Sequence, residues 1–169
     1  GDKRTLKKGT LVYCILAGIF ASLAASLLAT LSQAGQVFEG YESASQTIFS
    51  QSVLMQIAAA GIVMPVVEEF NFRGLMYYRM KDYMSANMAM IISSLIFGLY
   101  HGNLIQGIYG FVMGLLMIFV YEKYQTMLAP VLCHVGANLI SIVLEFLNIQ
   151  LDSVMIAAVI AVVCLAGVY

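Results

Sequence analysis

Apolar runs long enough to cross a membrane follow one another along almost the whole of this chain of 169 residues. Hydrophobic residues make up 62% of the sequence and charged residues only 10%, whereas a typical soluble domain is about 25% charged. A water-soluble domain of this size has too little interior to bury so much apolar surface. The hydrocarbon core of a bilayer takes about 20 apolar residues per helical span. The sequence therefore predicts an integral, multi-pass membrane protein.

We expect an all-α, polytopic transmembrane helix bundle of about six spans with an intramembrane polar cavity. The spans are expected at about residues 11–31, from 48 past Pro65, and at 86–100, 104–121, 127–147 and 153–168. The first apolar run is too long for the core of a signal peptide and has no clear cleavage site, which favours a retained anchor. Between the second and third spans, residues 70–83 mix charges with tyrosines, as is typical of a membrane–water interface.

The basic residues indicate how the chain is oriented. Lysine and arginine occur only before the first span, around residues 73–81 and at position 123, whereas the other loops carry only acidic charges. Positively charged loops tend to remain in the cytoplasm, so we expect a cytoplasmic N-terminus. No basic tract suggests a nucleic-acid partner. The three cysteines all fall in apolar runs and predict no disulfide framework.

Five ionisable side chains stand inside or beside the apolar runs: Glu68, Glu69, Arg73, His101 and His134. A charge at the centre of a membrane helix costs roughly 2.5–3.5 kcal/mol on the gentlest scale. Chains keep such groups in lipid when the groups pair with one another or take part in chemistry. These residues, which include both histidines of the chain, are therefore the first candidates for a functional site.

Helical spacing divides the candidates. Glu69 and Arg73 are four residues apart, so they share a helix face and can form an ion pair. Glu68 points about 100° away from Glu69 on a helix and can face a cavity. His134 and Asn138 are also four residues apart, which presents an imidazole and a carboxamide together.

These groups can hydrolyse an amide bond. A buried carboxylate beside imidazoles can act as a general base on water, and a carboxamide such as Asn138 can donate to a developing oxyanion. Alternatively, a zinc ion could activate the water, with Glu68, His101 and His134 as its ligands. Each part also has a structural explanation, as an ion-pair clamp or as a buried core residue.

Three short motifs carry these residues: EEFNFR at 68–73, FGLYH at 97–101 and HVGAN at 134–138. They resemble the EExxxR, FxxxH and HxxxN signatures of the CPBP family. That family includes CAAX-prenyl endopeptidases of the Rce1 type and bacterial Abi proteins of bacteriocin processing and self-immunity. The similar region covers about residues 53–147.

The resemblance implies an intramembrane endopeptidase that acts on a peptide or protein substrate at the bilayer, in a bacterial plasma membrane. It implies that Glu68 is the base that activates water, with His101 and His134 around the same water or a divalent metal. Asn138 is implied to stabilise the oxyanion, and the Glu69–Arg73 pair to support the architecture. The chain then divides into an anchor span with a polar loop (1–47), a catalytic core (48–150) and a C-terminal span (151–169).

Two other functions stay open. A protein of the same fold could bind a peptide or partner without cutting it, as a bacteriocin self-immunity or scaffold protein. A small proton-coupled transporter could use Glu68 and the histidines as a relay. A transporter is expected to contain an inverted repeat or paired broken helices, and the sequence indicates neither.

Catalysis requires Glu68, His101 and His134 to converge, in a cavity that we expect to open toward the cytoplasm. Hydropathy puts His101 at the outer end of its span and the other two nearer the inner side. The spans of Glu68 and His134 must therefore carry them deeper, or the turn after His101 must dip inward.

Three glycines of the fourth span, Gly107, Gly110 and Gly114, lie on one helix face. Small residues on a membrane helix let another backbone approach closely. The row is therefore expected to pack against a neighbouring helix or, alternatively, to hold a substrate peptide.

Overall fold

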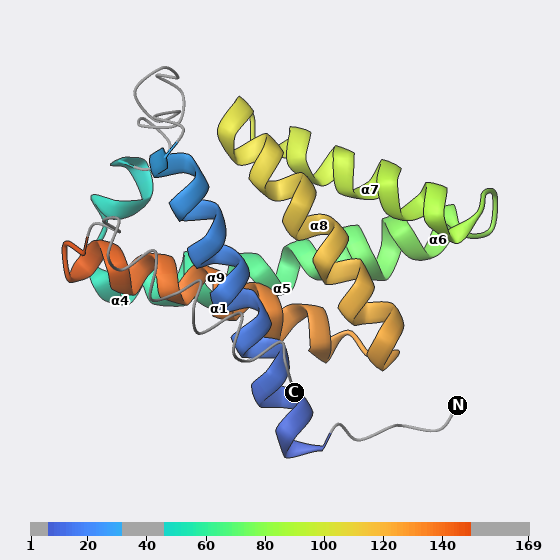
Figure 1. Cartoon of the computed structure of the whole chain (residues 1–169), viewed down its shortest axis with the longest axis horizontal. Coiled ribbons are helices and arrows are strands. Elements are labelled where there is room, and N and C mark those ends of the chain that lie inside the picture. The colour runs from blue at the N-terminus through green and yellow to red at the C-terminus, as the bar shows by residue number, and fades with distance from the viewer. Residues whose placement is uncertain (1–6, 32–45, 150–169) are drawn as a thin grey trace.

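A computed structural model of the chain describes residues 7–31 and 46–149, and every regular element within them is a helix (Figure 1). Four helical stretches are long and apolar enough to cross a membrane: most of α1 (Lys8–Leu31), the stretch Val53–Met80, α8 (Leu104–Tyr124) and α9 (Leu128–Phe146). A shorter apolar helix is α7 (Ala86–Tyr100). The predicted all-α membrane bundle is confirmed, whereas the span predicted at 153–168 and the loop at 32–45 lie outside the described residues.

Large apolar side chains cover the outside of the bundle. Leu54, Leu99 and Phe146 leave 78%, 70% and 66% of their surface exposed, and many other leucines, isoleucines and valines are exposed as well. Water-soluble proteins rarely expose apolar patches of this extent. The hydrocarbon of a bilayer is the environment that such a surface fits.

The second span is one long helix, Val53–Met80, of 28 residues. It consists of α4 (Val53–Met55), the π-helix η1 (Gln56–Val63), α5 (Met64–Glu69), the π-helix η2 (Phe70–Tyr77) and α6 (Tyr78–Met80). The second span does not end near residue 70, because the helix continues and buries Phe72, Arg73 and Tyr77. Phe72 and Tyr77 pack against α7 and α8, whereas Phe70, Tyr78 and Tyr83 are exposed.

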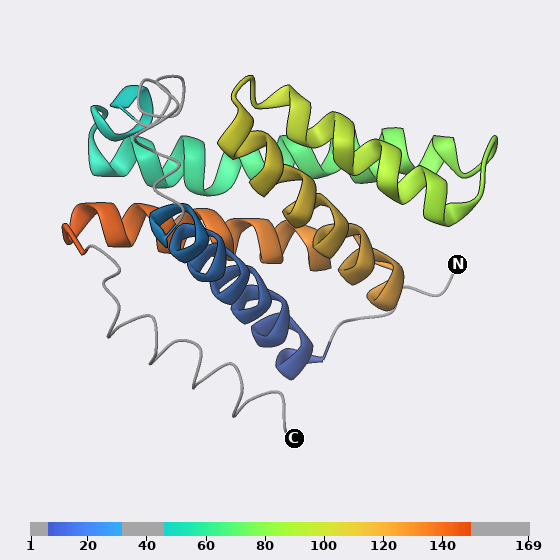
Figure 2. The ribbon, with the colours of Figure 1, turned by 45° about the horizontal axis from the view of Figure 1, so that its top comes forward.

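The long helix and α7 form a hairpin, joined by the short turn between Met80 and Ala86 (Figure 2). The Phe72 ring lies 4.9 Å from that of Phe97 and 5.5 Å from that of Tyr100, centroid to centroid. The chain therefore runs back along the second half of the long helix. A residue of the long helix therefore lies beside the residue of α7 that is about equally far, along the chain, from the turn.

Side chains and backbone conformation set the ends of the helices. Ser85 caps α7 by accepting from the Met88 N–H, and Asn103 caps α8 by accepting from the Gln106 N–H. Such caps satisfy donors that the first helical turn leaves unpaired. Gly102, between α7 and α8, has a φ of 74°, which glycine adopts without steric cost.

The glycines of α8 pack against α7. A Cβ atom added to Gly98 of α7 would lie 2.3 Å from the Gly107 carbonyl oxygen, and one added to Gly114 would lie 2.9 Å from the Ser94 Cβ. The two backbones meet because side chains are absent at these positions. The packing alternative is confirmed, because α7 lies against all three glycines of α8; Gly110 also lines the cavity described below.

Helices α1 and α9 cross at a similarly close contact. A Cβ atom added to Gly18 would lie 1.7 Å from the Cys133 carbonyl oxygen, and one added to Gly136 would lie 2.5 Å from the Ile15 carbonyl oxygen. Cys14 and Cys133 are unpaired and fully buried beside this crossing. They behave as small apolar residues, as predicted; Cys164 lies outside the described residues.

We predict that Gly18→Ala destabilises the protein by about 2 kcal/mol or more, because overpacking of a close contact forces the backbones apart. Gly9→Ala is the matched control, since a Cβ atom there meets nothing within 4 Å. Unfolding in detergent, followed by circular dichroism against temperature, measures both variants. Equal unfolding midpoints for the two would contradict the close α1–α9 crossing.

Candidate active site

A cavity of about 590 Å³ lies among α1, the long helix, α8 and α9 and at the end of α7. Its lining includes the four residues predicted to be catalytic: Glu68, His101, His134 and Asn138. More than half of the remaining lining residues are apolar, and the others carry uncharged polar side chains. The arrangement matches the convergence that a hydrolytic site requires.

Glu68 and His134 face each other across this cavity. The Glu68 Oε2 lies 3.6 Å from the His134 Nε2, and both side chains are largely buried. Helix α5 supplies the carboxylate and α9 supplies the imidazole. A carboxylate and an imidazole thus lie close together in the wall of one cavity. The cavity beside them has room for a substrate.

The hairpin of the long helix and α7 brings His101 to the same region. Glu68 lies twelve residues before the hairpin's first end, Met80, and His101 lies fifteen residues after its second end, Ala86. At 1.5 Å per residue these positions are about 18 and 22 Å from the turn. The hydropathy estimate put Glu68 too near the inner side because the helix runs ten residues beyond the expected end of the span.

Phe97 connects the two histidines. Its ring centroid lies 5.0 Å from that of His101 and 5.9 Å from that of His134, both edge to face. The Arg73 guanidinium lies over the same ring, 4.3 Å from its centroid. Phe97 is 2% exposed, so one buried ring positions three polar side chains.

A buried hydrogen-bond chain fixes the orientation of His134. Glu69 Oε1 accepts a hydrogen bond from His134 Nδ1 at 2.8 Å and from Arg73 Nη1 at 3.0 Å. Glu69 and Arg73 are 0% and 1% exposed. Because Nδ1 carries the donated proton, the Nε2 of a neutral ring is an acceptor, and it is the atom nearest Glu68.

The sequence predicted the Glu69–Arg73 pair but not its third member. The i, i+4 spacing identifies a local partner, whereas His134 lies 65 residues away from Glu69. The sequence did indicate that the two glutamates differ, since two adjacent carboxylates stand beside a single arginine. The structure gives that arginine to Glu69 and leaves Glu68 at the cavity.

His101 is held in a comparable tautomer. Its Nδ1 lies 2.8 Å from the Phe97 carbonyl oxygen, and a carbonyl only accepts, so Nδ1 carries the proton. In the neutral ring Nε2 is again the acceptor. In both histidines Nδ1 is thus used in a hydrogen bond to the protein, whereas Nε2 can accept a hydrogen bond from another group.

Pro65 explains how Asn138 is placed. In η1 the backbone bonds span five residues, and the last of them runs from the Met64 N–H to the Ala59 carbonyl. With the same spacing the Ala60 carbonyl would pair with residue 65, but proline has no N–H. The Asn138 Nδ2 donates to the Ala60 carbonyl at 2.8 Å instead, which leaves its second N–H for other partners.

The expected metal ligands do not assemble into a metal site. Within residues 7–31 and 46–149, no group of three His, Cys, Asp or Glu side chains lies in an arrangement that could hold a metal ion. Glu68, His101 and His134 line the same cavity without forming such a group.

Comparison with known proteins identifies the family. The family model described as type II CAAX prenyl endopeptidase Rce1-like matches residues 50–140, which is more than half of the chain and includes all three motifs. A Bacillus subtilis (strain 168) protein named "Putative membrane peptidase YdiL" is 27% identical over 95 residues.

The aligned region covers 56% of this chain and 39% of that relative's length. No solved structure matches the chain. The match to the family model and the apolar spanning helices lead to one conclusion: the chain is an integral membrane protein and belongs to the Rce1-like family of type II CAAX prenyl endopeptidases.

Proposed function

We propose that this protein is an intramembrane endopeptidase in which Glu68 activates water for attack on a peptide bond. The observation that carries the proposal is the position of Glu68, at the cavity and 3.6 Å from the His134 Nε2. The adjacent Glu69 is engaged by Arg73 and His134. Of the two neighbouring carboxylates, only Glu68 is therefore suited to act as the base.

In the proposed reaction the Glu68 carboxylate takes a proton from water as the water oxygen bonds to the carbonyl carbon. The carbonyl oxygen becomes an oxyanion, to which the second N–H of Asn138 donates. The C–N bond then breaks, and Glu68 returns the proton to the leaving nitrogen. The products are a carboxylic acid and an amine, and Glu68 is ionised again.

The histidines orient the water in this mechanism. His134 Nε2 can accept a hydrogen bond from a water that lies beside Glu68, because Nδ1 is already bonded to Glu69. A carboxylate behind an imidazole fixes its ring and its tautomer and raises its basicity. Glu69 and Arg73 are thus positioning residues, since they act through His134.

The cavity lining favours an uncharged, apolar stretch of peptide as substrate. Among the described residues that line it, Glu68 is the one carboxylate and no lysine or arginine is present. Four methionines, Met55, Met64, Met113 and Met117, contribute flexible apolar surface that adapts to different side chains. A lining without a cation does not favour recognition of a free C-terminal carboxylate, which supports cleavage at an internal bond.

We predict that Glu68→Gln abolishes cleavage without unfolding the protein, because loss of a general base typically costs about 10²–10⁴-fold in rate. Purified protein in liposomes is incubated with a library of apolar peptides, and products are identified by mass spectrometry. Glu145→Gln, at an exposed carboxylate outside the cavity lining, is the control and retains full activity. Cleavage by Glu68→Gln at the wild-type rate would refute the assignment of the base.

Glu69→Gln is expected to act differently from its neighbour. It removes the charge that pairs with the buried Arg73, and breaking a buried ion pair costs about 3–5 kcal/mol. We therefore expect a lower unfolding midpoint together with reduced cleavage for Glu69→Gln. Glu68→Gln loses cleavage and keeps its midpoint, so unfolding midpoints and rates measured side by side separate the roles. Equal stability of the two variants would contradict the buried chain.

Chelators test the metal alternative. Because Glu68 and the two histidines do not form a metal-holding group, we expect cleavage to persist after treatment with EDTA or phenanthroline. Activity is measured in the liposome assay before and after dialysis against the chelator. Loss of cleavage that zinc restores would show that a metal assembles the site and would overturn direct activation by Glu68.

A further inference from the structure

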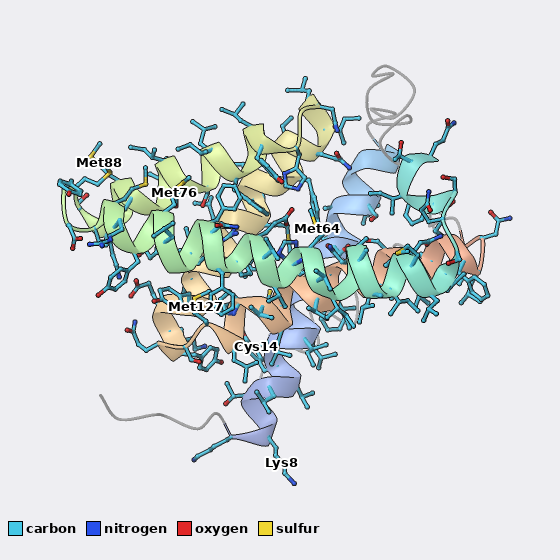
Figure 3. All side chains as sticks on the ribbon, turned by 180° about the vertical axis from the view of Figure 1, so that it is seen from behind. Lys8, Cys14, Met64, Met76, Met88 and Met127 are labelled. Carbon is cyan, nitrogen blue, oxygen red and sulfur yellow. The ribbon has the colours of Figure 1, made fainter. Side chains whose placement is uncertain are left out.

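One face of the long helix forms a continuous wall of the cavity. Four residues of this helix line the cavity at a spacing of four along the chain: Gln56, Ala60, Met64 and Glu68. Residues at this spacing share a helix face. Figure 3 shows the long helix running across the molecule, with the labelled Met64 near its middle. A peptide bound at Glu68 can therefore extend along this wall toward Gln56.

The wall determines how much of a peptide it can contact. Gln56 and Glu68 are twelve residues apart, which is at most about 18 Å of helix. An extended peptide advances about 3.3 Å per residue. Gln56 thus lies about five substrate residues away from a bond held at Glu68. Between them, Ala59 and Ala60 line the cavity, and such small residues let another backbone approach closely.

Two hydrogen bonds hold the Gln56 side chain in one orientation. Gln56 is 7% exposed, and its Nε2 donates to the Phe49 carbonyl at 3.2 Å and to the Gln51 carbonyl at 2.8 Å. Carbonyl oxygens only accept, so the amide nitrogen is the atom that faces them. These bonds use both N–H groups of the side chain. The remaining polar atom of this cavity-lining residue, Oε1, can only accept a hydrogen bond.

An extended peptide needs such an acceptor. Its backbone N–H groups have no partners within the peptide itself, and an unpaired N–H in an apolar environment costs free energy comparable to a lost hydrogen bond. More than half of the cavity lining is apolar. The lining also includes Gln106 of α8, but its Oε1 already accepts from the Asn103 side chain. The oriented Oε1 of Gln56 is therefore suited to pair with a substrate N–H.

We propose that Gln56 is a substrate-binding residue, whose Oε1 accepts a hydrogen bond from a backbone N–H of the peptide about five residues from the scissile bond. The proposal rests on the proposed function, because it takes the bond at Glu68 as the one that is cleaved. It defines the substrate as an extended, uncharged segment that continues along the wall on one side of the cleavage site. Recognition through the backbone accepts any side chain at that position except proline, which has no N–H.

A scan of backbone esters tests the contact. The library peptide that the wild type cleaves fastest is resynthesised with one amide at a time replaced by an ester, which removes one N–H and keeps every side chain. The value of kcat/KM in liposomes is measured for each peptide by mass spectrometry. We expect a loss of about 2–10-fold, as for one hydrogen bond, at one position about four to six residues from the cleavage site.

Two glutamine variants identify the acceptor. Gln56→Met removes Oε1 and keeps the approximate size of the side chain, so we expect the ester and the amide at that position to be cleaved at equal rates. Gln106→Met is the matched control, since the Oε1 that it removes is already bonded to Asn103, and it keeps the wild-type loss. If Gln56 only anchored Phe49 and Gln51, its substitution would slow all peptides alike and leave the ester loss in place.

Absence of an ester-sensitive position at this distance in the wild type would overturn the proposal, and this result does not depend on whether a variant folds. An ester loss that persists in Gln56→Met would also overturn it. Binding of the same peptides to Glu68→Gln, followed by fluorescence, separates this proposal from the proposed function. Ester-sensitive binding without cleavage by the wild type would reject the endopeptidase and leave the Gln56 contact standing, whereas cleavage without an ester-sensitive position would do the reverse.

Discussion

The hydrogen-bond chain of Arg73, Glu69 and His134 is the interaction on which the rest of the site depends. An isolated guanidinium or carboxylate at this depth would be too costly to keep, so each must have a partner within the protein. Glu69 accepts from both other residues through one oxygen. The chain thereby joins the long helix to α9 and fixes the His134 ring. It also settles which of two adjacent carboxylates remains at the cavity.

The backbone of the long helix contributes through its two π-helical stretches. They flank the short α-helix Met64–Glu69, which carries both glutamates, and π-helical turns occur frequently at functional sites. The first stretch, together with Pro65, leaves a carbonyl for Asn138 to bind. A proline ordinarily breaks a helix. Here it leaves the Ala60 carbonyl free to bind Asn138, which fixes the position of α9 along the long helix.

Local features of the site could be predicted from the sequence, whereas long-range ones could not. The i, i+4 rule predicted the Glu69–Arg73 pair and separated Glu68 from it, because helix geometry alone decides which residues share a face. The partner of Glu69 on α9 and the carbonyl bound by Asn138 depend on how helices cross, which a single sequence does not contain. Glycine spacing predicted a close helix contact but could not say that α7 makes it.

The misjudged features share one cause. Hydropathy ends a span where charged and aromatic residues begin, and it therefore ended the second span near residue 70. The helix continues because Arg73 pairs with Glu69 and Tyr77 donates to Glu122, so each of these polar side chains has a partner inside the bundle. The extra length changes the height of Glu68 and its alignment with His101.

The shortness of α7 has a consequence for the surrounding lipid. Its fifteen residues measure about 22 Å, which is less than the roughly 30 Å of a typical hydrocarbon core. Its last turn, capped by backbone bonds from His101 and Gly102, therefore ends within the depth of the acyl chains unless the bilayer becomes thinner beside it. Hydrophobic mismatch of this kind is relieved by local thinning of the membrane. We expect the lipid beside the turn between α7 and α8 to be compressed, to an extent that depends on the acyl-chain length of the host membrane.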